Sequence, residues 1–212
     1  MESRSREVSA RGDKNIAIRI VPGHFATNHS HINFYVDMSG IKTRHKMAKR
    51  AGEQLARAYS MTSIDTIICL EGTEVIGAFL ADYLTQSGHM DMNSGKEICV
   101  LTPELNSNNQ MIFRDNIQSE VWNKHILLLI ASASTGKTIN RAVDCLNYYS
   151  GQLIGIAAVF SAVRSSNGID VRSIFTEADL PSYETFIPAE CEMCKQKQKI
   201  DAIVNSHGYS KL

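Results

Sequence analysis

The sequence predicts one α/β domain, built on a doubly wound, mainly parallel sheet with helices on both faces. Between residues 66 and 160, short apolar runs alternate with longer segments of helical periodicity. The runs lack in-and-out alternation, which is typical of strands covered on both faces. A chain of 212 residues is long enough for one such domain with a substantial core.

The first part of the chain contains two strand candidates and one helix. Residues 17–21 (AIRIV) and 33–37 (NFYVD) flank a histidine-rich loop. Residues 42–59 are predicted to be helical, because apolar side chains recur there at helical spacing. Residues 1–14 are polar, and we expect them to form a flexible arm.

The remaining elements alternate along the chain. Strands are predicted at residues 66–70, 97–101, 125–130, 152–163 and 171–175, and helices at 74–84 and 138–149. Such connections give right-handed parallel pairing, and ligands bind beyond the carboxyl ends of the strands. The loops after residues 70, 101 and 130 therefore matter most for function.

The composition excludes some classes of protein. The 22 basic and 22 acidic residues cancel, which argues against nucleic-acid binding through a broad basic field. No apolar run approaches the ~20 residues of a membrane helix, and the polar N-terminus lacks the apolar region of a secretory signal. We expect a cytoplasmic protein, with Cys69, Cys99 and Cys145 as reduced, buried thiols.

The segment HILLLIASASTGKT runs from a buried strand through small and hydroxylated residues into a helix. Small residues allow close backbone approach, and the N–H groups at a helix start favour an anion. The segment is therefore predicted to bind a phosphate group. An ordinary capped helix is one alternative. A P-loop is another, although Ala131 stands where its first glycine belongs and no magnesium-holding Asp follows a later strand.

Four segments in order resemble the type I phosphoribosyltransferases, and the orotate enzymes in particular. They are GHFATNHSHINFYVD, IDTIICLEGTEVIGAFLADYL, the polar stretch after residue 101, and ILLLIASASTGKTINRAVDCL. The resemblance covers most of residues 16–164. It implies a phosphoribosyltransferase domain at residues 15–180, with residues 15–42 as a small N-terminal hood and substrate loop. Residues 181–212 would form a C-terminal extension or tail.

The resemblance implies a function and a set of ligands. The reaction would transfer phosphoribosyl from phosphoribosyl pyrophosphate to a pyrimidine base, with Mg²⁺ on the diphosphate, as in pyrimidine nucleotide biosynthesis. Five consecutive residues of the phosphate loop would cradle the 5-phosphate: Ser134, Thr135, Gly136, Lys137 and Thr138.

The segment LEGT would form the pyrophosphate loop, with Glu71, Gly72 and Thr73 facing the leaving group. A plain strand-to-helix turn capped by Thr73 is the alternative. We expect Glu74 to point away, because two carboxylates beside a pyrophosphate repel it unless Mg²⁺ intervenes.

Three further residues have roles implied by the resemblance. Arg164 would meet the carboxylate of the base, for which a planar guanidinium is suited, or it would simply lie in solvent. His29 occupies the place of a substrate-loop lysine. Arg114 is the only cation of residues 104–123, which would form a mobile catalytic loop reaching into a second subunit, so a homodimer is implied.

Cys191 and Cys194 form a C-x-x-C, which is half of a zinc site. His207 or residues of another subunit would have to complete it. His24, His29 and His31 are also close in sequence, but we expect solvated loop histidines there rather than a metal site.

One departure bears on catalysis. Type I enzymes usually carry two adjacent acids that bind the ribose hydroxyls, and these positions fall on Ile130 and Ala131. Two hypotheses follow. The chain is an active phosphoribosyltransferase, or it is a module that binds phosphoribosyl pyrophosphate or a nucleotide without turnover.

Overall fold

The computed structural model describes residues 2–86, 91–106 and 110–212, and its centre is a six-stranded sheet in the order β10-β11-β9-β8-β4-β5. The strands from β11 to β5 run parallel, and β10 pairs antiparallel at one edge. The strands are β4 (Thr66–Cys69), β5 (Cys99–Leu101), β8 (His125–Ala133), β9 (Gln152–Ser161), β10 (Ser165–Ser166) and β11 (Ile169–Thr176). The prediction of a doubly wound, mainly parallel sheet is confirmed.

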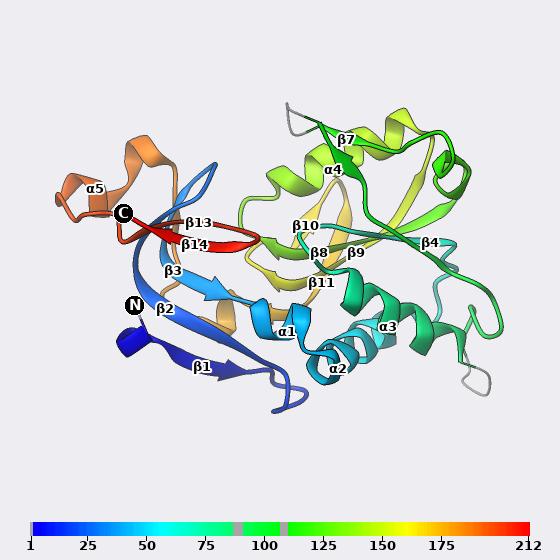
Figure 1. The fold of residues 1–212 in the computed structure, drawn as a ribbon, viewed down its shortest axis with the longest axis horizontal. Helices are drawn as coiled ribbons and strands as arrows, with labels where there is room; N and C mark the ends of the chain where they lie inside the picture. The colour runs from blue at the N-terminus through cyan, green and yellow to red at the C-terminus, as the bar shows by residue number, and fades with distance from the viewer. Residues whose placement is uncertain (1, 87–90, 107–109) are drawn as a thin grey trace.

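Helices cover both faces of this central sheet (Figure 1). Along β8, Leu127 and Leu129 belong to the core shared with α2 (His45–Ala56) and α3 (Glu74–Thr85). Leu128 and Ile130 belong to the opposite core, shared with α4 (Lys137–Tyr148). Successive side chains of a strand point to opposite faces, so a continuous apolar run is what a strand between two helical layers requires.

The helix predicted at residues 42–59 is divided in the structure. α1 (Ser39–Thr43) is followed by Arg44 in an extended conformation, and then come α2 and the 3-10 turn η2 (Arg57–Tyr59). α2 crosses α3 closely at Gly52, where an added Cβ would lie 2.8 Å from the backbone nitrogen of Leu80. Any larger side chain would push the two helices apart.

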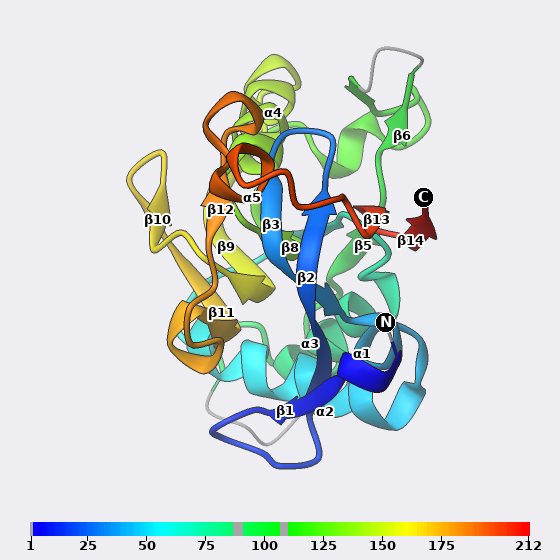
Figure 2. The ribbon, with the colours of Figure 1, turned by 90° about the vertical axis from the view of Figure 1, so that its left-hand side faces the viewer.

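A second six-stranded sheet forms a hood at one end of the molecule (Figures 1 and 2). Its main path is β12-β3-β2-β13-β14, and β1 also pairs with β2. The strands are β1 (Arg6–Ser9), β2 (Ala17–Ala26), β3 (His31–Asp37), β12 (Thr185–Phe186), β13 (Ala202–Asn205) and β14 (Gly208–Lys211). Segments from both ends of the chain therefore build one sheet, and the C-terminal extension is part of the hood.

The prediction of a flexible arm at residues 1–14 is wrong for residues 6–9. They pair with Ala17–Ile20 of β2 as strand β1, and Val8 packs against the core. The Arg4 guanidinium also donates to the Asp201 carboxylate at 2.7 Å. The sequence did not predict this strand because its residues are mostly polar. Only one of its faces touches the core.

The remaining elements are short. The polar stretch after β5 contains the hairpin β6 (Glu104–Leu105) and β7 (Met111–Ile112), while residues 107–109 of the loop expected to be mobile lie outside the described residues. The other short helices are η1 (Glu2–Arg4), η3 (Gln118–Glu120), η4 (Glu177–Asp179), η5 (Pro188–Glu190) and α5 (Glu192–Lys195). Among the described residues, no helix is both long and apolar enough to cross a membrane.

Candidate functional site

A cavity of about 480 Å³ lies where β4 and β8 end, between the central sheet and the hood. The loops that follow these two strands line it, together with the turn between β2 and β3 and the turn between β13 and β14. Its volume is in the range of small-molecule sites. The cavity stands at the carboxyl ends of parallel strands, where the sequence predicted a ligand.

The predicted phosphate loop lines this cavity along its whole length, from Ser134 to Thr138. Gly136 precedes α4 in a left-handed conformation with φ of 73°, which side chains rarely adopt. Its carbonyl accepts the N–H of Asn140 and so begins the helix. Residues 134–138 therefore present the start of α4 to the cavity, as an anion site requires.

Basic side chains gather at this end of the cavity. Lys137 and Arg141 both line it, and they stand one turn apart on α4. His29 faces the same cavity from the β2–β3 turn, where the Thr27 hydroxyl accepts its backbone N–H at 3.1 Å. Burial lowers the pKa of His29, and the charges of Arg141 and Lys137 lower it further. An anion placed here would meet two fixed positive charges and one that depends on pH.

The loop after β4 carries a carboxylate toward the end of β8. Glu71 has a φ of 60°, and its carboxylate accepts the backbone N–H of Ser132 at 3.0 Å. Burial raises the pKa of Glu71. β4 has already ended at this level of the sheet. The Glu71 carboxylate therefore takes the place of a β4 carbonyl as acceptor for the backbone N–H of Ser132 in β8.

Lys42 joins three parts of the cavity wall. From α1, its ammonium donates to the carbonyl of Glu71 at 2.9 Å and to that of Ser206 at 2.5 Å. Ser206 belongs to the turn between β13 and β14, so the hood and the loop after β4 are tied together. Burial lowers the pKa of Lys42.

Thr73 does not face the cavity as expected. Its side chain is fully buried, and its hydroxyl hydrogen is shared between the carbonyls of Leu70 at 2.9 Å and Leu129 at 3.2 Å. Thr73 therefore fixes the loop that presents Glu71 and Gly72. Glu74, which we expected to point away, lines the cavity, and its carboxylate accepts the hydroxyl of Thr102 at 3.0 Å.

The two arginines that the resemblance singled out lie elsewhere. Arg164 is exposed after β9 and is not among the residues that line the cavity. Arg114 is also outside it, where its guanidinium forms an ion pair with Glu104 through contacts of 2.5 and 2.9 Å. Within this one chain, neither cation reaches the phosphate loop.

Two of the three loop histidines lie next to the C-x-x-C, which the sequence did not predict. His24 is on β2 and is fully buried, so the expectation of a solvated loop histidine is wrong for it. His24 and His31 share a cluster with Cys191 and Cys194, and this cluster can hold a metal ion. His207, suggested above as a ligand, lines the cavity instead.

Solved structures of phosphoribosyltransferases have the same arrangement of elements. The Mycobacterium tuberculosis H37Rv orotate phosphoribosyltransferase, in complex with 5-phospho-alpha-D-ribosyl 1-diphosphate, matches with a TM-score of 0.51 and 16% identity over 69% of this chain and 82% of its own. Leishmania donovani UMP synthase matches with a TM-score of 0.56 and 13% identity over 76% of this chain and 34% of its own. The chain has the type I phosphoribosyltransferase fold.

Within this fold, the adenine phosphoribosyltransferase of Thermoanaerobacter pseudethanolicus matches with a TM-score of 0.50 and 16% identity, over 82% of this chain and 96% of its own. Orotate and adenine enzymes thus match alike, so the fold does not single out a base. No protein-family model and no curated protein sequence matches the chain.

Ile130 and Ala131, which the resemblance placed at the positions of the acidic pair, are buried in the core. No ribose hydroxyl can be bound by their side chains. The carboxylate of Glu71 lies next to these residues, where it accepts the backbone N–H of Ser132.

Sequence reasoning missed three contributors to this site. Arg141 was detectable, because it follows Lys137 by one helical turn and so shares its face. No pattern in the sequence around Lys42 or Tyr183 indicated that either residue would lie at this site. The Tyr183 hydroxyl lies 3.1 Å from that of Ser134, a contact between residues 49 positions apart.

Proposed function

We propose that this chain binds phosphoribosyl pyrophosphate and transfers its phosphoribosyl group to a pyrimidine base, of which orotate is the first candidate. One observation carries the proposal. A single cavity joins a phosphate loop surrounded by Lys137, Arg141 and His29 to a second loop that carries the carboxylate of Glu71. A phosphorylated sugar with a second charged group at its other end matches this arrangement.

The 5-phosphate would bind to the backbone N–H groups and hydroxyls of residues 134–138, with Lys137 and Arg141 neutralising its charge. The diphosphate would lie against the loop of Glu71 and Gly72. Mg²⁺ favours oxygen ligands and often uses only one or two carboxylates together with substrate phosphates. Glu71 and Glu74 both line the cavity and fit that role. When bound, Mg²⁺ would neutralise charge on the departing diphosphate.

In the transfer, a ring nitrogen of the base forms a bond to C1 of the ribose and gives up its proton to solvent or to the departing diphosphate, while the bond from C1 to the diphosphate oxygen breaks. The diphosphate leaves with the bonding electrons. Catalysis of this kind depends on positioning and on stabilisation of developing charge. We propose that Glu71 supplies the negative charge that Ile130 and Ala131 cannot, close to the ribose and to the positive charge that builds on it.

A second candidate is binding of phosphoribosyl pyrophosphate or a nucleotide without turnover. The apolar, buried side chains of Ile130 and Ala131 favour it, as does the position of Arg164 outside the cavity. Both candidates use the same phosphate loop, so only a turnover measurement separates them.

The test is an assay of the purified protein with phosphoribosyl pyrophosphate, Mg²⁺ and, in parallel, orotate, uracil and adenine. We expect pyrophosphate release that depends on orotate, with formation of orotidine monophosphate. Binding of phosphoribosyl pyrophosphate by calorimetry without release of pyrophosphate with any base would establish the second candidate. Absence of both would refute both.

We also propose a cytoplasmic homodimer, in which Arg114 of one subunit serves the cavity of the other. The exposure of Arg114 and its position outside its own cavity support this. Co-expression of Arg114→Ala and Gly136→Asp chains tests it, because a mixed dimer would hold one intact site. Activity that stays at the level of the separate variants, or monomeric elution, would count against the shared site.

A further inference from the structure

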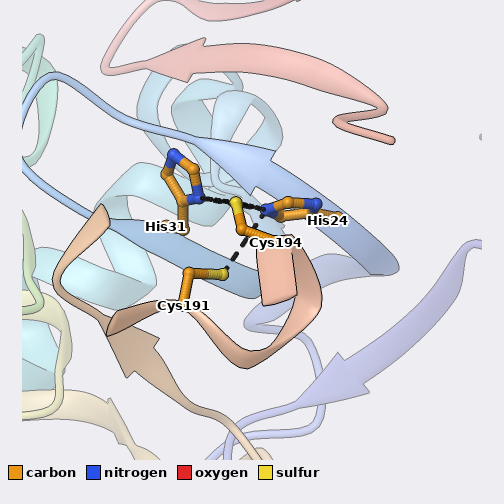
Figure 3. A group of neighbouring side chains, drawn as sticks. All are labelled: His24, His31, Cys191 and Cys194. Atoms are coloured by element: carbon orange, nitrogen blue, oxygen red, sulfur yellow. Dashed lines mark hydrogen bonds between the residues drawn. The ribbon is translucent and has the colours of Figure 1, made fainter. Parts of the chain in front are cut away.

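Four side chains from distant parts of the chain meet in one cluster in the hood (Figure 3). His24 comes from β2, His31 from β3, and Cys191 and Cys194 flank the start of α5. One nitrogen or sulfur atom of each lies within 4.8 Å of all the others. Within the part of the chain that the structure describes, this is the one group of three or more His, Cys, Asp or Glu residues with such a geometry.

We propose that this cluster is a structural zinc site with two histidine and two cysteine ligands. With ordinary Zn–N and Zn–S bond lengths, tetrahedral ligand atoms lie about 3.3 Å apart for two nitrogens and about 3.6 Å apart for nitrogen and sulfur. Here Nε2 of His24 lies 3.0 Å from Nδ1 of His31, and three of the four nitrogen–sulfur separations are 3.3, 3.6 and 3.7 Å. All four atoms lie within 4.8 Å of one another, close enough to surround one zinc ion.

The second ring nitrogen of His24 supports a metal ligand. Nδ1 lies 2.9 Å from the carbonyl oxygen of Gln198, which can only accept a hydrogen bond. Nδ1 therefore carries the proton, and Nε2 turns its lone pair toward His31 and the two sulfurs. Metal-bound histidines are commonly fixed in this way by a backbone carbonyl.

Burial distinguishes the cluster from a chance gathering of surface groups. His24 and Cys191 are each 0% exposed. His31 is partly buried and Cys194 is exposed, but without metal the buried His24 nitrogen and the Cys191 thiol would have only weak hydrogen bonds within the cluster. A zinc ion would satisfy all four at once. The mixture of thiolate and imidazole favours zinc over Mg²⁺ or Ca²⁺, which prefer oxygen.

The site is closed rather than catalytic. Four protein ligands complete a tetrahedron and leave no open position for water or substrate. Its role is to clamp α5 onto the turn end of the β2–β3 hairpin, where the two lie side by side (Figure 2). Shortly after the cluster, Asp201 continues the attachment: its backbone N–H donates to the His24 carbonyl at 2.7 Å, and its carboxylate accepts the His24 N–H at 2.9 Å.

The first test is metal content. We expect about one zinc per chain in the full-length protein purified without chelator, and loss of most of it in Cys191→Ser and in His31→Ala. Cys145→Ser is the matched control, because Cys145 is a partly buried thiol on α4, outside the cluster. This variant should keep its zinc.

The second test does not depend on variants that fold. Zinc should be replaceable by Co²⁺ in the unmodified chain, which then gives the absorption bands of tetrahedral cobalt bound to thiolate. Alkylation by N-ethylmaleimide, mapped by mass spectrometry, should spare Cys191 and Cys194 until a chelator is added. Reduced protein that binds neither Zn²⁺ nor Co²⁺, or whose two cysteines react equally fast with and without chelator, overturns the proposal.

Hydrogen exchange tests whether the zinc site clamps the C-terminal segment onto the β2–β3 hairpin. Removal of zinc should raise hydrogen exchange in residues 191–205 at least several-fold, while β8 in the central sheet stays protected. Unchanged exchange in residues 191–205 after removal of zinc would refute the clamp. None of these measurements depends on phosphoribosyl transfer, so they test the zinc site independently of the proposed function.

Discussion

The carboxylate of Glu71 accepts the backbone N–H of Ser132 at 3.0 Å, which joins the loop after β4 to the end of β8. The two residues belong to the two loops that border the cavity. One side chain therefore sets the relative position of both loops, and it also brings negative charge to a cavity that Ile130 and Ala131 line with apolar side chains.

Replacement of Glu71 by Gln separates its charge from its hydrogen bond. The amide oxygen of Gln can still accept the N–H of Ser132, but the negative charge is lost. We expect turnover with phosphoribosyl pyrophosphate and base to fall about 100-fold, the scale of a single catalytic group. Steady-state kinetics measures this, and Glu53→Gln on α2, away from the cavity, is the matched control. Unchanged turnover would remove Glu71 from catalysis.

The same variant should not lose stability. Burial raises the pKa of Glu71 in the folded protein above its unfolded value, so the ionised form is the one that folding disfavours. The cost is present at pH 7 and disappears as the pH falls through the folded pKa. A neutral Gln never bears this cost. We expect the Tm of Glu71→Gln at pH 7 to equal or exceed that of the parent, and a clear decrease would show that the charge itself stabilises the fold.

Gly136 allows a test of the phosphate loop with two nearly identical side chains. Its φ of 73° is the conformation that Asn and Asp tolerate best after glycine. Gly136→Asp adds a negative charge beside the bound phosphate, whereas Gly136→Asn adds the same bulk without it. We expect Asp to weaken binding of phosphoribosyl pyrophosphate at least about tenfold more than Asn does, as measured by calorimetry. Equal effects would mean that no phosphate binds at this loop.

His29 should make anion binding depend on pH. Its pKa is lowered in the free protein, chiefly by burial, so its ring is neutral at pH 7. A bound anion favours the protonated ring and raises that pKa. Binding therefore takes up a proton, and affinity rises as the pH falls from 7 toward 5. Sulfate is the appropriate probe, because its own charge is constant over this range.

The control for this measurement is His29→Gln. Its affinity for sulfate should change less with pH than that of the parent, because the glutamine side chain does not titrate. If the two proteins show the same pH dependence, His29 does not face the bound anion.

Thr73 should matter for stability rather than for substrate binding. Its buried hydroxyl serves the carbonyls of Leu70 and Leu129. Thr73→Val keeps the shape but removes the donor, so we expect the free energy of unfolding to fall by about 1–3 kcal/mol. Thr73→Ser keeps the hydroxyl and should lose less. Denaturant unfolding measures both, and a normal stability of the Val variant would contradict this role.

Local signals in the sequence were sufficient for the central sheet and for the loop between β8 and α4 that lines the cavity. Apolar runs such as residues 125–130 are continuous because both faces are covered, and the change to small and hydroxylated residues marks the loop itself. These features depend on neighbours along the chain. Even so, the break at Arg44 was missed, because nothing in residues 42–59 interrupts the helical periodicity.

The hood could not be predicted in the same way. β13 is four residues long and pairs with β2 from the other end of the chain. His24 and Cys191 are 167 positions apart, yet they meet in one cluster. Tertiary packing decides which segments pair over such distances. Neither the periodicity of a strand nor the spacing of two cysteines indicates which distant segment will be the partner.

The parallel pairing of β13 with β2 also sets the order in which this protein can be completed during synthesis. The central sheet ends at β11, so all of its strands are synthesised before residues 202–203. β2 must wait for residues 202–203 before that edge is paired. Until then, an open strand edge near the N-terminus is available to other chains. A nascent chain that stalls or is cut short before residue 202 leaves residues 25–26 of β2 without this partner, and we expect it to aggregate more readily than the full chain.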